Sequence, residues 1–360
     1  MSDRRLIFVT QLMDRDDPVL GATAGMVEAL SQRFEQVVVI ANEVRRGPEG
    51  IEVISLGKEH GRGRVARALA YQRALARLLR HNRPDALLAH MCPVYLTAAA
   101  PRAKLARVPT ILWFAHPRDS RTLRTAEWLC DVVLTSMPGS YPRPGPKVRV
   151  IGQAVDLDRF PMAPPPQGAQ GVMRLVALGR TSDSKRYDLA IGGVAAARAG
   201  GSDIRLRIVG PSTNAREREE RTRLAGQIDA LGLGEAVRLE DGVPAAQVPD
   251  LLASSDGLLS TTVDGSGDKA VFEAMAIGRP VITSNPVFAD LLAGLPLALR
   301  FPTGDVQALG ACLAQLARAD VTAVTGTGTL LSARVAQGHS RAHWADEVHD
   351  VVDLLAGARR

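Results

Sequence analysis

Short runs of apolar and β-branched residues alternate with helical stretches along most of the chain, and this alternation restricts the fold more than any other feature. Such continuous runs are typical of parallel strands buried on both faces of a sheet, and helices between them indicate βαβ units. In the first half, strands are expected at 6–10, 37–41, 51–56, 86–90, 110–115, 131–136 and 148–152. Helical stretches are expected at 22–34, 63–82, 95–106 and 119–129.

Residues 161–171, PMAPPPQGAQG, interrupt the alternation with a stretch that is rich in proline and glycine, as is typical of a linker. The alternation then restarts, with strands expected at 174–179, 204–209, 236–240, 257–261, 280–284 and 297–301. Helices are expected at 185–199, 214–231, 245–254, 268–277 and 304–318, and a last helical stretch covers 339–357.

The predicted fold class is therefore α/β, with two Rossmann-like, doubly wound domains that face each other across a cleft. The expected domains are 1–160 on the acceptor side and 172–338 on the donor side, joined by the linker at 161–171. Residues 339–360 are expected to form a helix that packs back on the first domain. Because ligands of open α/β sheets bind beyond the carboxyl ends of the strands, this architecture favours a group-transfer enzyme.

Composition excludes several other classes of protein. The chain has 360 residues, of which 46% are hydrophobic and 23% charged, as in ordinary globular proteins. Cys92, Cys130 and Cys312 lack metal-site spacing and are interpreted as buried thiols of a reducing compartment. The N-terminal residues do not resemble a signal peptide, and no apolar stretch is long enough for a membrane span. A cytoplasmic location is expected.

The net charge of +6 is unevenly distributed, because residues 1–150 carry 23 Lys and Arg against 14 Asp and Glu. A basic half indicates an anionic partner, such as a membrane surface, a phosphorylated acceptor or nucleic acid. Aromatic residues make up only 4% and do not interleave with basic ones, so nucleic acid is not expected. Peripheral contact with the inner face of an anionic membrane remains an option.

Residues 175–191, LVALGRTSDSKRYDLAI, combine a strand, a short basic loop and a helix start. Gly179 ends the strand, and Arg180 and Lys185 follow before the helix. Two cations beside a helix N-terminus form a natural seat for a diphosphate. A surface loop with two solvated cations is the alternative interpretation.

Residues 264–285, DGSGDKAVFEAMAIGRPVITSN, form a second candidate segment. The glycines at 265 and 267 leave backbone N–H groups free for an oxygen-rich ligand. Glu273 follows on a short helix with small neighbours and could accept both hydroxyls of a ribose. A capped helix with an exposed glutamate is the alternative.

These motifs occur in a recognisable order: GR…K, then VGP at 209–211, then EAMAxGxPVI. In this order the chain resembles the donor domain of family 4, group 1 glycosyltransferases of the GT-B fold. In the first half, IGQAVDLDRF at 151–160 and WFAHP at 113–117 resemble the family's domain-closing segment and histidine-bearing loop. The segment at 17–30 corresponds to its N-terminal glycine loop.

The resemblance implies a retaining, metal-independent transfer from a UDP- or GDP-linked sugar, with no cofactor and no metal site. It implies that Arg180 and Lys185 hold the leaving diphosphate, that Glu273 binds the ribose and that His116 lies near the transferred sugar. The expected catalytic residues are His116, Arg180, Lys185 and Asp268. The expected donor-binding residues are Gly21, Gly179, Arg180, Lys185, Gly210, Gly242, Val243, Asp264, Gly265, Ser266, Gly267, Asp268, Lys269, Ala270 and Glu273.

The sequence departs from the family pattern in the glycine-rich loop. The family carries two glutamates separated by seven residues, and the first would fall at Gly265. Asp264 or Asp268 is expected to contact the sugar hydroxyls in its place. A sugar-nucleotide epimerase of the same fold and a binding protein without transfer activity therefore remain alternatives. The acceptor is a glycan, a lipid-linked molecule or a small molecule.

Three weaker features have structural explanations beside functional ones. His339 and His343 are four apart on an expected helix, which is metal-ligand spacing, but no third ligand is evident. The aspartates at 14, 16 and 17 are interpreted as solvated loop carboxylates. On the helix at 62–83, the arginines at 73, 77 and 80 share a face that could contact anionic lipid, while the opposite face covers the sheet.

Overall fold

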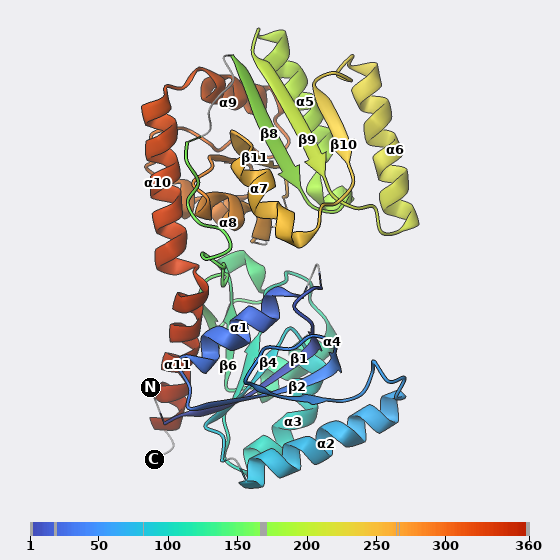
Figure 1. Cartoon of the computed structure of the whole chain (residues 1–360), viewed down its shortest axis with the longest axis vertical. Coiled ribbons are helices and arrows are strands. Elements are labelled where there is room, and N and C mark those ends of the chain that lie inside the picture. Colours follow the sequence, from blue (N-terminus) through green and yellow to red (C-terminus); the bar gives the residue numbers. More distant parts are fainter. Residues whose placement is uncertain are drawn as a thin grey trace. The chain divides into compact units, whose positions relative to one another are not determined.

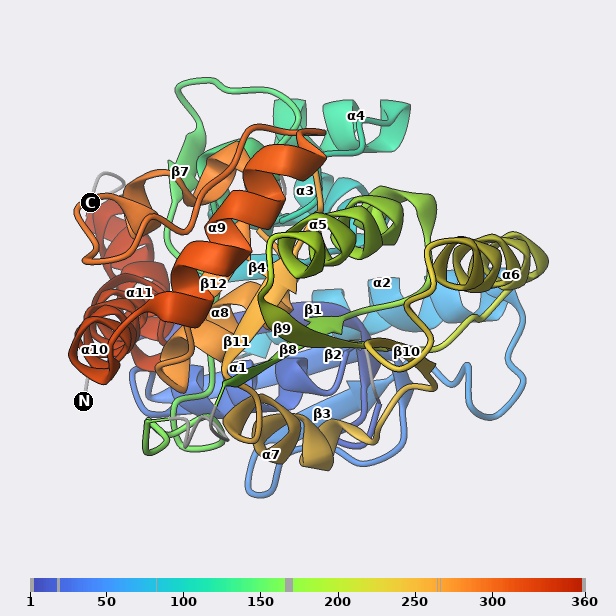
Figure 2. The same cartoon turned by 90° about the horizontal axis from the view of Figure 1, so that it is seen from above.

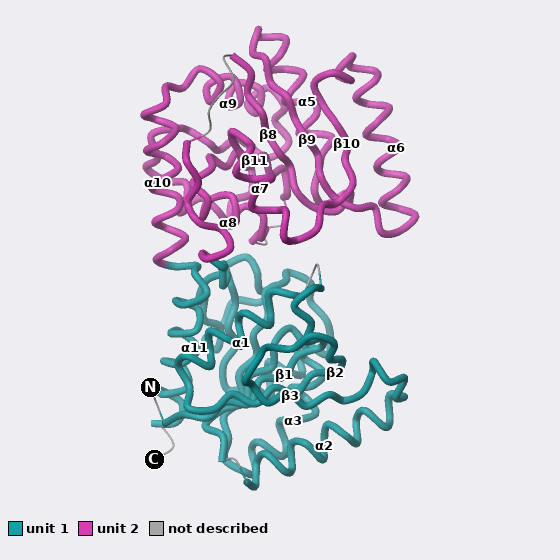
Figure 3. The backbone as a smooth tube through the Cα atoms, in the orientation of Figure 1, with its two compact units in different colours: residues 1–156, 338–360 teal, residues 157–337 magenta. Residues whose placement is uncertain are grey.

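The computed structural model describes residues 3–17, 20–81, 83–165, 171–263, 265 and 267–357, and divides the chain into two units. Unit 1 contains residues 1–156 and 338–360, and unit 2 contains residues 157–337 (Figure 3). Each unit is built on its own parallel sheet, of seven strands in unit 1 and five in unit 2 among the described residues. The predicted α/β class is confirmed.

Unit 1 has the strand order β3-β2-β1-β4-β5-β6-β7, so the direction of strand addition reverses between β1 and β4. Its elements are β1 (Arg5–Met13), α1 (Ala22–Ser31), β2 (Gln36–Val44), β3 (Glu52–Ser55), α2 (Arg64–His81), β4 (Ala86–His90), α3 (Pro93–Leu105), β5 (Thr110–Trp113), α4 (Arg121–Leu129), β6 (Val132–Thr135), β7 (Val148–Val150) and α11 (Arg341–Gly357).

Two apolar layers enclose this sheet. Alternate strand residues such as Ile7 and Val9 pack with buried side chains of α2, α3 and α4. Their neighbours Leu6 and Phe8 point to the other face, where they pack with α1 and α11. The last helix thus belongs to the core of unit 1, and its Trp344 is fully buried in edge-to-face contact with Trp113 of β5. Figure 1 shows α2 and α3 together below the sheet.

Unit 2 has the strand order β10-β9-β8-β11-β12, with its reversal between β8 and β11. Its elements are β8 (Val172–Leu178), α5 (Tyr187–Ala199), β9 (Asp203–Val209), α6 (Ala215–Ala230), β10 (Val237–Glu240), α7 (Val248–Ala253), β11 (Gly257–Ser260), α8 (Lys269–Ala276), β12 (Val281–Thr283), α9 (Val306–Arg318) and α10 (Val321–Gly338). Helices α5 and α9 lie side by side, as Figure 2 shows, because Gly193 and Gly310 let the two helices approach closely.

Two predictions about regular structure are wrong. The expected strand at 297–301 is only a single bridge between Thr283 and Arg300. Pro296 and Pro302 flank this segment, and proline has no N–H to continue a ladder. The helix α10 was not expected, since its threonines and glycines have low helix propensity. It forms because Leu331 and Val335 are buried and because Gly328 packs against the Gly278 carbonyl, 2.2 Å from where a Cβ would lie.

The helical pairing expected for His339 and His343 is also wrong. Helix α10 ends at Gly338 and α11 begins at Arg341, so the two histidines do not share a helix. His339 lies in the connection, where burial lowers its pKa to about 4 and its carbonyl accepts from the Val155 N–H at 2.7 Å. Within the described residues, no group of three potential ligands could hold a metal ion.

Candidate functional site

The candidate donor residues of unit 2 gather at the carboxyl edge of its sheet. Gly179 and Arg180 follow β8, Gly210 follows β9, Gly242 and Val243 follow β10, and Asp268 caps α8 after β11. Ligands of doubly wound sheets bind at this edge, next to the point where the strand order reverses. In unit 2 that point lies between β8 and β11.

An ion pair bridges the reversal point. Lys185, from the loop after β8, donates from Nζ to Asp268 Oδ2 at 2.6 Å, and both side chains are largely buried. Thr261, directly after β11, donates from Oγ1 to the Lys185 carbonyl at 2.7 Å. Asp268 Oδ1 also accepts from the Ala270 N–H at 3.3 Å, which caps α8. The carboxylate therefore orients Lys185 and begins the helix at the same time.

Glycines allow the loops around this lysine to touch. A Cβ at Gly210 would lie 1.9 Å from the Gly179 carbonyl oxygen, so only glycine fits at the end of β9. Gly179 itself has φ +140°, and a Cβ there would lie 2.6 Å from Lys185 Cε. Tyr187 donates from its hydroxyl to the Gly179 carbonyl at 3.0 Å. The Gly179 loop and Lys185 therefore pack closely against each other.

Arg180 has an anchored carboxylate partner that the sequence analysis did not identify. Its Nη1 donates to Glu217 Oε1 at 3.1 Å, while 62% of the Arg180 side chain stays exposed. The other oxygen of Glu217 accepts from the N–H and the hydroxyl of Thr213 at 2.6 and 2.7 Å, and these bonds lower its pKa. The capping pattern of Asn214 and Glu217 predicts a helix start, but nothing local links this glutamate to Arg180.

Glu273 is a buried carboxylate on α8. Its side chain is 10% exposed and forms an ion pair with Lys269, one turn earlier, at 3.2 Å. Burial raises the pKa of Glu273, although the charges of Lys269 and Arg159 oppose this shift. Glu273 is thus a largely buried carboxylate beside the half-exposed Lys269, and its oxygens can accept hydrogen bonds from a ligand hydroxyl.

The glycine-rich loop is described only in part, since Asp264 and Ser266 lie outside the described residues. Gly265 has φ +72° with open space where a Cβ would lie. Gly267 and Ala270 are half-buried and lead into α8, whose first residue is Lys269. At β10, a Cβ on Gly242 would lie 2.8 Å from the Pro211 ring, while Val243 is half-buried.

Two expected site residues belong to unit 1. Gly21 begins α1, and a Cβ there would lie 2.5 Å from the Asp17 carbonyl oxygen, so its own loop already requires glycine. His116 is exposed after β5, and its Nδ1 accepts from the Arg118 N–H at 3.0 Å. This bond engages Nδ1 of the ring.

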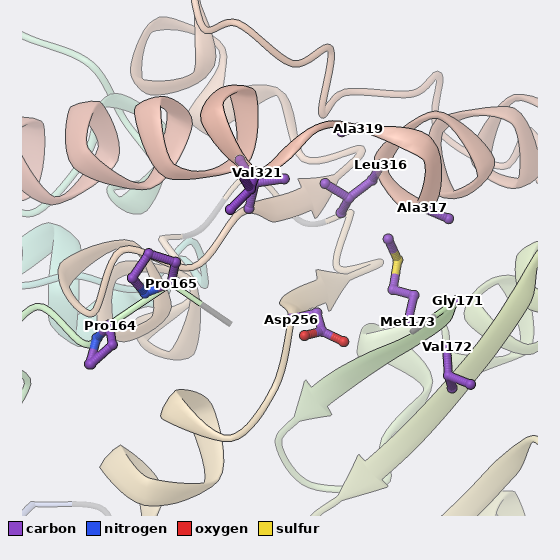
Figure 4. A pocket seen from close by; sticks show the side chains of 11 residues that line it. Pro164, Pro165, Gly171, Val172, Met173, Asp256, Leu316, Ala317, Ala319 and Val321 are labelled. Carbon is purple, nitrogen blue, oxygen red and sulfur yellow. The ribbon is translucent and has the colours of Figure 1, made fainter. Parts of the chain in front are cut away.

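A cavity lies elsewhere in unit 2. It has a volume of about 600 Å³, and its lining includes Met173 and Val172 at the start of β8, Asp256 and Leu316 of α9 (Figure 4). These residues lie at the amino edge of the sheet, opposite to the carboxyl edge that carries Lys185. All three cysteines are free and buried, as predicted.

Comparison with known proteins shows which family part of the chain resembles. Residues 173–319 match the family model described as glycosyl transferases group 1. The putative colanic acid biosynthesis glycosyltransferase WcaL of Salmonella typhimurium is 28% identical over 202 residues, which are 54% of this chain and 48% of that protein. Residues 173–319, which lie within unit 2, are therefore similar to group 1 glycosyltransferases. The match spans about half the length of this curated relative.

Solved structures show the GT-B fold. A glycosyltransferase from Rickettsia africae superposes with a TM-score of 0.76 at 12% identity, over 98% of this chain and 99% of that one. Anabaena HepE in complex with UDP and glucose superposes with a TM-score of 0.72 at 16% identity, over 97% of this chain and 99% of that one. The GT-B fold predicted from the sequence is therefore confirmed.

Proposed function

We propose that the chain transfers a sugar from a nucleoside-diphosphate sugar to an acceptor hydroxyl. The observation that carries this proposal is the Lys185–Asp268 pair at the reversal point of the unit 2 sheet, with Arg180 on the same loop. A diphosphate needs fixed positive charge at a site that a backbone can approach closely, and Gly179 and Gly210 supply that approach. The match of this unit to a group 1 family model supports the same chemistry.

The proposed donor is a UDP-linked sugar. Anabaena HepE was crystallised with UDP, with UDP-glucose, and with UDP and glucose. By analogy, Glu273 accepts from the ribose hydroxyls, residues after β10 such as Gly242 and Val243 meet the base, and Arg180 and Lys185 hold the two phosphates. GDP-linked donors are the alternative that the binding assay below distinguishes.

We propose a retaining transfer without a metal. The bond between the anomeric carbon and the phosphate oxygen breaks, and its electron pair leaves with the diphosphate. The acceptor oxygen attacks the same face, and its proton passes to the departing phosphate oxygen. Arg180 and Lys185 stabilise the charge that develops on the leaving group, so the step depends on positioning and electrostatics and not on a strong base. His116 is proposed to lie near the transferred sugar.

A thermal-shift screen of nucleoside diphosphates tests the donor site. UDP at 100 times its Kd should stabilise the chain by about 2.7 kcal/mol. Lys185→Met should remove most of this stabilisation, whereas the matched change Lys104→Met, at an exposed lysine of unit 1, should not. Equal stabilisation of both variants would contradict the role of Lys185.

A transfer assay separates the alternatives. A glycosyltransferase should release UDP from a UDP-sugar when a suitable acceptor is present, and a slow release to water is expected without one. An epimerase would interconvert sugar nucleotides without releasing UDP. The observation that favours a binding protein is Gly265 in place of the first family glutamate. A chain that binds UDP but neither releases UDP from a UDP-sugar nor interconverts sugar nucleotides would support a binding protein.

A further inference from the structure

The outer face of the layer formed by α2, α3 and α4 carries an unusual charge. Residues 60–118 contain eleven Lys and Arg but a single acidic residue, Asp85. That carboxylate is already engaged, since it accepts from Arg4 Nη1 and from the Arg5 N–H, each at 2.9 Å. We call this outer face the basic layer.

Most cations of the basic layer have no hydrogen-bond or ion-pair partner in the part of the chain that the structure describes. Three cations are engaged, because Arg67 donates to Asn42 at 2.7 Å, Arg77 pairs with Glu52 at 2.8 Å and Arg102 donates to Gln72 at 2.6 Å. Within the described residues, no hydrogen bond or ion pair engages another set of exposed side chains, namely those of Arg62, Arg64, Arg73, Arg80, Arg83, Lys104 and Arg107. The two carboxylates of the α4 segment do not compensate them, because Asp119 and Glu127 are both paired with Arg143.

Large apolar side chains are exposed on the same layer. The exposed fractions are 75% for Val65 and 51% for Leu69 on α2, 56% for Val94 and 88% for Leu105 on α3, and 77% for Trp128 on α4. Residues 64–70, the first two turns of α2, include no buried residue, so this end of the helix extends beyond its contact with the sheet. Exposed apolar residues that gather on one surface mark an interaction site.

These side chains share one side of unit 1. Buried residues of α2, α3 and α4 all pack against the same face of the sheet, and α1 and α11 cover the opposite face. Tyr71 of α2 packs edge-to-face on Tyr95 of α3, which holds these two helices together. The surface that faces away from the sheet therefore combines unpaired cations with exposed valine, leucine and tryptophan.

We propose that the basic layer docks on an anionic lipid membrane. Lipid phosphates match the unpaired arginines, while the apolar side chains and Trp128 enter the interfacial region between head groups and acyl chains. A nucleic acid would match the charge but would leave the aliphatic side chains without a partner. No described helix is long and apolar enough to cross a membrane, so the proposed contact is peripheral. The proposal does not depend on the donor site.

The layer is placed suitably for an acceptor in the membrane. The first turns of α2 follow β3, and Val94 follows β4, so both lie toward the carboxyl edge of the unit 1 sheet. His116 also follows a strand end at this edge. Ligands of α/β sheets bind there, so docking through α2 brings a lipid surface to the ligand-binding edge of unit 1.

Tryptophan fluorescence of the full chain tests the proposal directly. Trp113 and Trp344 are 4% and 0% exposed, so Trp128 is the tryptophan that a lipid can reach. Vesicles that contain phosphatidylglycerol and a phosphatidylcholine brominated on its acyl chains should quench it, and 0.5 M salt should reverse the effect. Trp128→Phe should abolish the quenching. Vesicle binding without quenching of Trp128 would overturn the assignment of this face.

Charge variants provide the matched comparison in a vesicle flotation assay. The triple variant Arg73→Gln, Arg80→Gln and Lys104→Gln should bind anionic vesicles about 100-fold more weakly, since each basic residue near the surface contributes about 1 kcal/mol. The control removes three exposed arginines of unit 2, at 174, 205 and 318, and should bind like the unaltered chain. Equal weakening of both variants, or equal recovery on neutral and anionic vesicles, would overturn the proposal.

Discussion

Replacing Asp268 with asparagine separates the two roles of this carboxylate. Asparagine is as good a helix cap as aspartate, so the hydrogen bond that Oδ1 accepts from the Ala270 N–H is retained. The negative charge next to Lys185 is lost, and so is the 2.6 Å hydrogen bond, because the amide nitrogen that replaces Oδ2 cannot accept from Nζ. We expect Asp268→Asn to bind UDP more tightly than the unaltered chain, because the carboxylate opposes a phosphate at the same lysine.

The magnitude follows from the geometry. A phosphate oxygen bound on the other side of Lys185 Nζ would lie about 5 Å from the Asp268 carboxylate, which is two hydrogen-bond lengths. Two like charges at about 5 Å repel by about 3 kcal/mol at an effective dielectric constant of about 20. Since 12% of the Asp268 side chain is exposed, solvent screens part of this repulsion. The expected gain is about 1.5–3 kcal/mol, or a 10- to 150-fold lower Kd for UDP.

Isothermal titration with UDP measures this effect, and a double-mutant cycle with Lys185→Gln explains its origin. If Asp268 only repels the phosphate, its replacement should tighten binding equally with and without Lys185. If Lys185 must also leave Asp268 to reach the phosphate, the gain should be larger when the lysine is present. An unchanged or weaker affinity of Asp268→Asn would refute the reasoning and would indicate that Asp268 itself contacts the nucleotide.

Three further predictions concern the same unit. Burial raises the pKa of Glu273, so its ionisation destabilises the folded chain as pH rises above the unfolded pKa of about 4.5. Glu273→Gln should therefore raise the melting temperature at pH 8 but not at pH 4. The same variant should bind UDP 10- to 150-fold more weakly, because it loses a charge-assisted hydrogen bond of about 1.5–3 kcal/mol. Transfer activity should persist in EDTA, and loss of turnover that a divalent ion restores would contradict a leaving group held by Arg180 and Lys185. Gly210→Ala should lower the free energy of unfolding by about 1–3 kcal/mol in urea titrations because its Cβ meets the Gly179 carbonyl, whereas Gly226→Ala, with open space on α6, should be neutral or stabilising.

Local patterns predicted the sheet framework because each buried strand is a continuous apolar run. Segments such as 37–41 and 204–209 became β2 and β9 with small changes at their ends. The prediction failed where tertiary contact overrides local preference. Helix α10 has an unfavourable composition and is held by packing around Gly328, a contact 50 residues distant from Gly278 that no local pattern contains.

The sequence predicted which residues belong to the candidate site, but not which cation pairs with which carboxylate. The cations and glycines of the donor segment follow from their order along the chain. Glu217 lies 37 residues after Arg180, and Asp268 lies 83 residues after Lys185. Both carboxylates reach their cations only because the parallel strands bring successive loops to one edge of the sheet. The expected contact of Asp268 with sugar hydroxyls stays a prediction.

The pairing of each cation with a carboxylate explains how strong positive charge can be kept at the carboxyl edge of unit 2. Lys185 is 19% exposed, and a largely buried ammonium without a partner would be costly. Asp268 removes that cost and fixes the direction of the ammonium, but we expect the same charge to lower the affinity for a diphosphate. Weaker binding of the released diphosphate favours its departure after transfer. We therefore propose that the departure from the family pattern in the glycine-rich loop favours product release, because one aspartate orients Lys185 and is expected to weaken its hold on the diphosphate.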